Sequence, residues 1–162
     1  MTHSKSQQSP SRRDVMLFGA AALLNPGMAN AQARNIWSAE VAYQALKAGE
    51  AVILDIRTSA EWKETGVAEG AWPVSLAQGG FARRLDIAFD LAGTRTMALI
   101  CATGGRSGYV QSILRRGGME GTVDVSEGML GSRLGPGWIK SGLPIVPLET
   151  ALRELPAKIR AA

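Results

Sequence analysis

The segment Met97–Ser107 reads MALICATGGRS and joins a short apolar run to a glycine-rich loop. Its Cys101 is the only cysteine in the 162-residue chain. A short apolar run of this kind is typical of a strand buried on both faces. A helix is predicted at 107–116, directly after the loop. The sequence therefore places its single thiol at the end of a buried strand, in a loop that ends with Arg106 and enters a helix.

Strand and helix patterns alternate on both sides of this segment. Strands are predicted at 51–56, 72–76, 97–101 and 122–126, and helices at 38–47, 59–65, 80–92, 107–116 and 149–160. Alternation of this kind predicts an α/β fold with a mainly parallel sheet. In such sheets, functional residues lie in the loops at the carboxyl ends of the strands, which is where Cys101 is predicted to be.

Two details of the predicted helices can be tested directly. The helix at 107–116 carries Tyr109, Val110, Ile113 and Leu114, which we expect to face the core. Pro156 lies inside the last predicted helix and must break or kink it, because proline lacks the amide hydrogen.

The first 33 residues are typical of an export signal. Arg12 and Arg13 precede the apolar run Val15–Leu24, and Ala-x-Ala patterns end at Ala31 and Ala33. The apolar run is about half as long as a bilayer-spanning helix, which argues against stable membrane insertion. The arginine pair resembles the bacterial twin-arginine export motif.

We therefore expect residues 1–33 to be a signal peptide, cleaved after Ala31 or Ala33, and residues 34–162 to form a single domain. The mature protein would then be periplasmic. The alternative is that the N-terminal segment is a basic, disordered tail.

Removal of the signal peptide constrains the chemistry of the mature chain. It takes away Lys5, Arg12, Arg13 and Asp14, so the formal charge falls from +4 to +2. That charge is too small to indicate a nucleic-acid partner. His3, the only histidine, is removed as well. No histidine-based triad, Cys-His pair or Cys/His zinc site can form, and a single cysteine cannot form an internal disulfide. Cys101 must therefore act without an imidazole.

The loop itself offers another way to stabilise a thiolate. Gly104 and Gly105 allow backbone conformations that turn amide N–H groups inward, toward an anion. The N-terminus of the following helix adds to this field. A thiol in this position should ionise more readily than an ordinary one. The alternative is a buried structural cysteine at a strand end, which is common for free cysteines.

The spacing Cys-x-x-Gly-x-Arg-Ser resembles the active-site loop of the rhodanese family, the thiosulfate and thiol sulfurtransferases. The stretch VILDIRTSAEWKETGVAEGAW is also similar to the family's first signature. The matching residues there are Asp55, Arg57, Glu61, Trp62, Gly66, Gly70 and Ala71. Val67 stands in place of the family's histidine, and Glu69 in place of its usual proline.

A closing pattern of the family is also present, with stretched spacing. Its matching residues are Gly128, Trp138, Gly142 and Pro144. The resemblance extends from about residue 36 to residue 146. It implies a rhodanese-like central sheet flanked by helices on both faces.

The resemblance also implies a sulfurtransferase that works by double displacement. The Cys101 thiolate would attack a donor such as thiosulfate, become a persulfide, and pass the sulfur to a thiophilic acceptor. The partners would be small donors and acceptors or a protein thiol, and neither a metal nor an organic cofactor would be needed. The substrate-binding residues implied are Ala102, Thr103, Gly104, Gly105, Arg106 and Ser107. Asp55, Arg57 and Glu61 would form a structural set of hydrogen bonds and ion pairs.

Two other functions remain open from the sequence. Phosphatases and arsenate reductases of related fold have five residues between cysteine and arginine, whereas four separate Cys101 from Arg106. The shorter loop suits a sulfur atom better than a phosphate, and no general acid stands out. The second alternative is a sulfur carrier or partner-binding module that does not turn over.

Overall fold

The computed structural model describes residues 35–162, so the predicted signal peptide lies outside the described residues. Its main sheet has the strand order β1-β6-β5-β2-β4, and every neighbouring pair is parallel. The strands are β1 (Ile36–Trp37), β2 (Ala51–Asp55), β4 (Trp72–Pro73), β5 (Thr96–Ile100) and β6 (Thr122–Val125). The prediction of an α/β fold with a mainly parallel sheet is confirmed.

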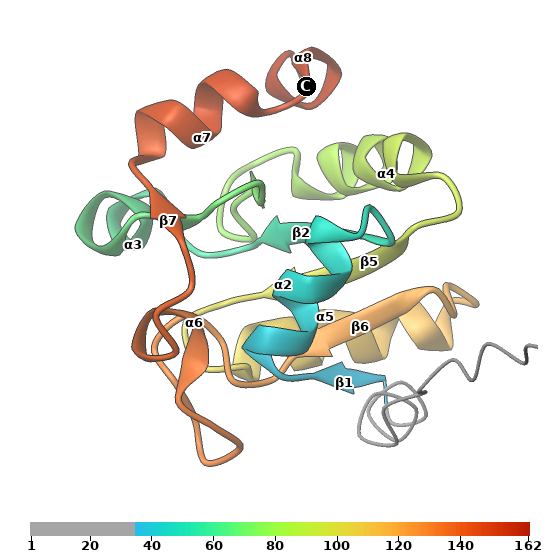
Figure 1. The fold of residues 1–162 in the computed structure, drawn as a ribbon. Coiled ribbons are helices and arrows are strands. Elements are labelled where there is room, and N and C mark those ends of the chain that lie inside the picture. Colours follow the sequence, from blue (N-terminus) through green and yellow to red (C-terminus); the bar gives the residue numbers. More distant parts are fainter. Residues whose placement is uncertain (1–34) are drawn as a thin grey trace, which may run out of the picture.

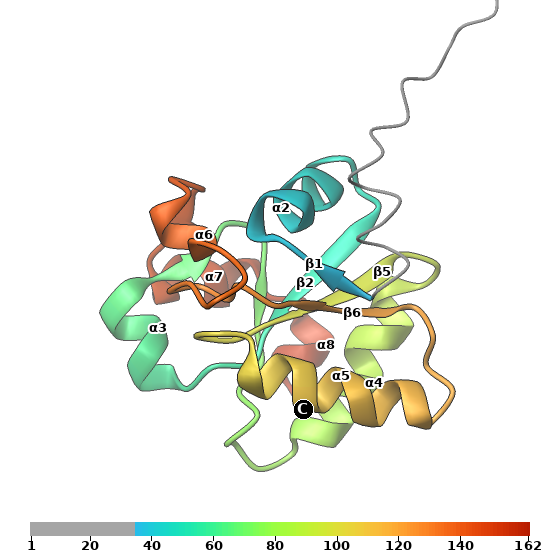
Figure 2. The ribbon, with the colours of Figure 1, turned by 90° about the horizontal axis from the view of Figure 1, so that it is seen from below.

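Helices cover both faces of this sheet (Figures 1 and 2). Helix α2 (Ala39–Lys47) lies on one face, and α4 (Phe81–Ala92) and α5 (Gly105–Arg116) lie on the other. Alternate residues of the central strands supply the two cores. Ile53 of β2 belongs to the core on the α2 side, and Leu54 to the core on the α4 and α5 side. This two-sided burial explains why β2 and β5 are apolar throughout.

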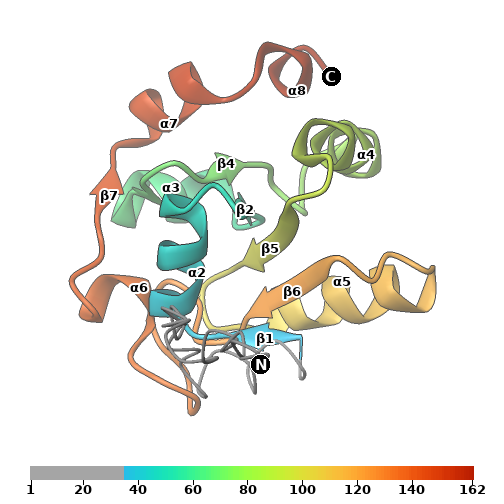
Figure 3. The ribbon, with the colours of Figure 1, turned by 45° about the vertical axis from the view of Figure 1, so that its right-hand side comes forward.

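The remaining elements are short. They are α3 (Ser59–Thr65), α6 (Gly137–Lys140), α7 (Leu148–Glu154), α8 (Ala157–Arg160), β3 (Val67–Ala68) and β7 (Ile145–Val146). Strands β3 and β7 pair antiparallel as a small second sheet. Figure 3 shows β7 leading from α6 to α7 at one side of the molecule. Pro156 separates α7 from α8, as predicted.

Helix α5 corrects one prediction. It begins at Gly105, two residues earlier than expected. Tyr109 and Ile113 do not face the core, because they are 66% and 44% exposed. Val110 is buried as predicted and Leu114 packs against the core, but the other buried residues of α5 are Ser107 and Gln111. Both are polar side chains with hydrogen-bond partners, so hydrophobicity alone identified only part of the buried face.

Candidate active site

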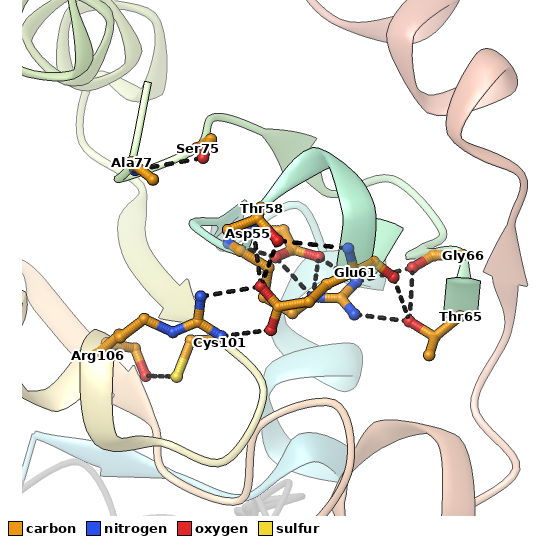
Figure 4. A network of polar contacts seen from close by, with 11 residues as sticks. Asp55, Thr58, Glu61, Thr65, Gly66, Ser75, Ala77, Cys101 and Arg106 are labelled. Atoms are coloured by element: carbon orange, nitrogen blue, oxygen red, sulfur yellow. Dashed lines mark hydrogen bonds and ion pairs between the residues drawn. The ribbon is translucent and has the colours of Figure 1, made fainter. Parts of the chain in front are cut away.

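Cys101 directly follows the central strand β5 and is 1% exposed. Its neighbours in space come from three parts of the chain: the loop into α5, the start of α3, and the segment after β6 (Figure 4). The thiol therefore lies at the carboxyl end of a parallel sheet, the position at which such sheets place functional groups.

The backbone around Cys101 is held in one orientation. The Met129 N–H donates to the carbonyl of Cys101, and the Leu130 N–H to that of Ala102, both at 2.9 Å. The described chain contains no cis peptide bond, so each N–H points opposite to the carbonyl of its own peptide unit. The amides of Ala102 and Thr103 therefore face away from the segment after β6.

These amides belong to a longer run of free donors. Within residues 35–162, none of the amide N–H groups of residues 102–107 donates a backbone hydrogen bond. Three of them, those of residues 105–107, belong to the first turn of α5, where an α-helix leaves its N–H groups unpaired. The loop thus contains the donors that the predicted anion cradle requires.

Glycine is required at two positions for this arrangement. Gly104 has a φ of +85°, and a Cβ there would lie 2.1 Å from the Ser126 carbonyl oxygen. A Cβ on Gly128 would lie 2.4 Å from the Ala102 carbonyl oxygen. Both distances are shorter than real contacts allow. The Cys101 loop and the segment after β6 can approach only because both positions lack a side chain.

Ser107 is the polar side chain that contacts the thiol. It is fully buried, and its hydroxyl lies 3.3 Å from the Cys101 Sγ and 3.2 Å from the Gly104 carbonyl oxygen. A hydroxyl carries one proton and can also accept. Ser107 can therefore donate to an anionic sulfur or brace the loop.

The side chain of Arg106 is paired with an acid. Its guanidinium binds both carboxylate oxygens of Glu61, with a distance of 2.9 Å from Nη1 to Oε2. This hydrogen bond is the main reason that the pKa of Glu61 is lowered from 4.5 to about 2. Glu61 also raises the pKa of Arg106. Glu61 completes a capping box with Thr58 at the start of α3, so the pair ties the Cys101 loop to that helix.

Asp55 and Arg57 form a separate, fully buried ion pair, with 2.7 Å between Arg57 Nη2 and Asp55 Oδ2. Arg57 also donates to the Thr65 hydroxyl and to the Gly66 carbonyl, each at 2.7 Å. These contacts fix the end of α3 against the end of β2. Among the described residues, neither side chain has a hydrogen bond to Cys101.

The predicted residues are thus divided between two sets. The loop residues 102–107 and Glu61 gather around Cys101, whereas Asp55 and Arg57 support α3. Two buried acids near the loop were not predicted. Glu127 accepts from the amides of Ala39 and Gly137, and Asp124 lies beneath α5. The alternation in TVDVS gave a signal for Asp124, since it sets this residue on the face opposite Val123 and Val125.

Two absences apply to residues 35–162. They contain no group of three or more His, Cys, Asp or Glu side chains that could hold a metal ion. No helix among them is long and apolar enough to cross a membrane.

Several solved structures are similar to this chain. Rv0390 from M. tuberculosis is 25% identical, with a TM-score of 0.52 over 67% of this chain and 94% of its own. The Alr3790 protein from Anabaena sp. is 18% identical, with a TM-score of 0.49 over 71% of this chain and 83% of its own. A protein of unknown function from Rhodopseudomonas palustris, described as a possible tyrosine phosphatase, is 18% identical, with a TM-score of 0.47 over 87% of this chain and 100% of its own.

No curated protein matches the chain. The family model for the rhodanese-like domain matches residues 38–131, which include β2, α3, the Cys101 loop and the segment after β6. This match spans more than half of the chain, and the protein therefore belongs to the rhodanese-like domain family.

Proposed function

We propose that the protein is a sulfurtransferase that carries sulfane sulfur as a persulfide on Cys101. One observation supports this most: the single thiol lies beside a buried hydroxyl and a loop whose amides, at residues 102–107, have no backbone acceptor in the described chain. Inward amides and a helix N-terminus favour an anion, and a persulfide is an anion at neutral pH.

The reaction has two displacements. The Cys101 thiolate attacks the outer sulfur of thiosulfate, an S–S bond forms on Cys101, and the S–S bond of thiosulfate breaks to release sulfite. An acceptor such as cyanide then attacks the outer sulfur of the persulfide and leaves as thiocyanate, which restores the thiolate. No electrons are gained or lost overall, and no cofactor is required.

The surroundings of Cys101 suit a small donor. Cys101 is only 1% exposed, so a bulky donor would have to displace the loop. Arg106 and Glu61 together add little net charge at the mouth of the loop, so the amides would supply most of the attraction for the donor. The same burial would shield a bound persulfide from solvent, which supports a second candidate function: a carrier that keeps its sulfur until a protein thiol displaces the loop.

Intact mass spectrometry tests the proposal. Thiosulfate or polysulfide should add one sulfur atom to the mature protein, and cyanide should remove it. Cys101→Ser should take up none, because a hydroxyl cannot carry sulfur in this way. Steady turnover from thiosulfate to cyanide would identify an enzyme, and sulfur uptake without turnover would identify a carrier. Unchanged mass with every donor, or Cys101-dependent hydrolysis of aryl phosphates, would contradict the proposal.

A charge-matched pair of variants tests the role of Arg106. Arg106→Gln should slow sulfur uptake from thiosulfate by about tenfold, because the unpaired Glu61 carboxylate then repels the anionic donor. The double variant Glu61→Gln/Arg106→Gln removes both charges and should recover most of the rate. Uptake from an uncharged sulfane-sulfur donor should change much less in either variant.

We further propose that the protein acts in the periplasm after export. The support is in the sequence alone: the arginine pair, the short apolar run and the Ala-x-Ala patterns before residue 34.

A further inference from the structure

A cavity of about 550 Å³ lies between the start of α3, the segment after β4, and α7. Leu148 and Leu152 line it from α7, and Thr58, Ser75 and Gln78 line it from the other two segments. We call it the α7 cavity. Its volume is in the range of small-molecule sites, about 300–1,000 Å³. Helix α7 lies beyond residues 38–131, so the family match does not account for this wall.

The α7 cavity adjoins the surroundings of Cys101 through Thr58. The Thr58 hydroxyl donates to Glu61 Oε2 at 2.7 Å, and Arg106 donates to the same oxygen at 2.9 Å (Figure 4). One carboxylate oxygen of Glu61 thus joins the wall of the cavity to the Cys101 loop. Because the charges of Glu61 and Arg106 cancel, a molecule that lies across the pair meets little net charge.

The register of the main sheet gives the distance between the α7 cavity and the thiol. Ile100 of β5 and Pro73 of β4 both pair with Asp55 of β2. Neighbouring strands are about 4.8 Å apart, so the residues that follow β5 and β4 are about 10 Å apart along the sheet edge. Cys101 follows β5, and Ser75 lies shortly after β4. A molecule whose sulfur lies at Cys101 would therefore reach the cavity with a chain of about seven atoms.

The lining of the α7 cavity determines which chain fits. None of its side chains is charged, and Leu148 and Leu152 supply apolar surface. The hydroxyl of Ser75, which is 5% exposed, accepts from the Ala77 N–H at 3.3 Å and donates to no atom within residues 35–162. An apolar chain that ends in an uncharged hydrogen-bond acceptor suits this lining. An ionised end does not, because it would lose water without gaining a counter-charge.

We propose that the α7 cavity binds the organic part of the sulfur acceptor, and that this acceptor is an uncharged thiol with an apolar chain of the length given above. The acceptor loses its proton to water, and its thiolate attacks the outer sulfur of the Cys101 persulfide. A new S–S bond forms on the acceptor, the S–S bond to Cys101 breaks, and the Cys101 thiolate is restored. No electrons are gained or lost overall. This transfer step rests on the proposed function, whereas binding of the chain does not.

A series of acceptors tests the proposal in the unmutated protein. The persulfide-loaded protein is mixed with mercaptoethanol, mercaptohexanol or mercaptohexanoate at equal thiolate concentration. Mercaptohexanol should react at least about tenfold faster than mercaptoethanol, because its additional methylene groups are buried against α7. Mercaptohexanoate, which has the same length but ends in a carboxylate, should react more slowly than mercaptohexanol. Equal rates for the two alcohols would overturn the proposal.

A pair of variants locates the effect. Leu152 is 38% exposed, and Leu152→Glu places a charge in the lining of the α7 cavity. The preference for mercaptohexanol over mercaptoethanol should fall about tenfold. Ile113→Glu makes the same change at an exposed apolar residue of α5 that does not line the cavity, and it should keep the preference. A preference that survives Leu152→Glu would overturn the proposal.

Alkyl methanethiosulfonates test the cavity without any persulfide. They transfer an uncharged alkylthio group to the Cys101 thiolate and release methanesulfinate. Relative to a free thiol in solution, the hexyl reagent should modify Cys101 at least about tenfold faster than the methyl reagent. This preference in a protein that takes up no sulfur would support the cavity and refute the proposed function. Normal turnover from thiosulfate to cyanide without a chain preference in either assay would overturn this inference alone.

Discussion

Gly104 has no side chain, and this allows the Cys101 loop to lie against the end of β6. The residue has a left-handed backbone, and the Ser126 carbonyl occupies the space that a side chain would need. Gly105, the next residue, has neither constraint: its φ is not positive and nothing lies within 4 Å of its Cβ position. The two adjacent glycines therefore have different roles, although they look equivalent in the sequence.

Gly104→Ala and Gly105→Ala should differ sharply in stability and reactivity. Gly104→Ala should destabilise the fold by at least about 2 kcal/mol, since positive φ costs roughly 1–2 kcal/mol and the clash adds to it. It should also slow alkylation of Cys101 by moving the amides. Gly105→Ala should stay within about 1 kcal/mol of the wild type. Urea unfolding and alkylation kinetics measure both effects, and equal behaviour of the two variants would contradict the assignment.

At the scale of the elements, the sequence predicts the long, periodic parts and misses the short ones. The apolar runs of β2 and β5 identify central strands because both faces are buried. Strands β1, β3 and β7 have two residues each, too few to show a period, and only their tertiary partners define them. In α5, the polar Ser107 and Gln111 are buried because each finds a hydrogen-bond partner, which no hydrophobic pattern reveals.

The contact between α5 and α3 is also hidden in the sequence, because 45 positions separate Glu61 from Arg106. The family signature identified both residues but grouped Glu61 with Asp55 and Arg57. The structure instead joins Glu61 to Arg106, and so makes it part of the surroundings of Cys101.

This contact predicts a pH-dependent stability. The pKa of Glu61 is about 2 in the folded protein, below its ordinary 4.5. Its ionised form therefore stabilises the fold above pH 4.5, and this contribution is lost as the pH falls from 4.5 toward 2. Thermal unfolding between pH 7 and pH 3 should show a steeper loss of Tm in the wild type than in Glu61→Gln. Glu64→Gln, an exposed acid of the same helix, should follow the wild type, and a parallel decline in all three proteins would refute the role of Glu61.

For the whole molecule, the sheet determines where the chemistry lies, and the loops determine what chemistry is possible. Parallel strands bring the ends of β2, β5 and β6 to one edge, where the residues that follow the strands are Ile56, Cys101 and Ser126. The sequence could predict this edge and the Cys101 loop. It could not predict the orientation of the loop, because that depends on hydrogen bonds from Met129 and Leu130, far along the chain.

At the scale of the whole molecule, export is predicted from the sequence of residues 1–33 alone. If residues 1–33 are a signal peptide, the protein recovered from a periplasmic fraction should begin at Gln32 or Arg34, as read by N-terminal sequencing. Replacing Arg12 and Arg13 together by lysine should retain the precursor in the cytoplasm, since the twin-arginine route depends on the pair and not on charge alone. Replacing Lys5 by arginine leaves the pair and the charge intact and should not affect export. Processing that continues in the double-lysine variant would indicate the general secretory route, and an intact N-terminus in a cytoplasmic protein would refute export altogether.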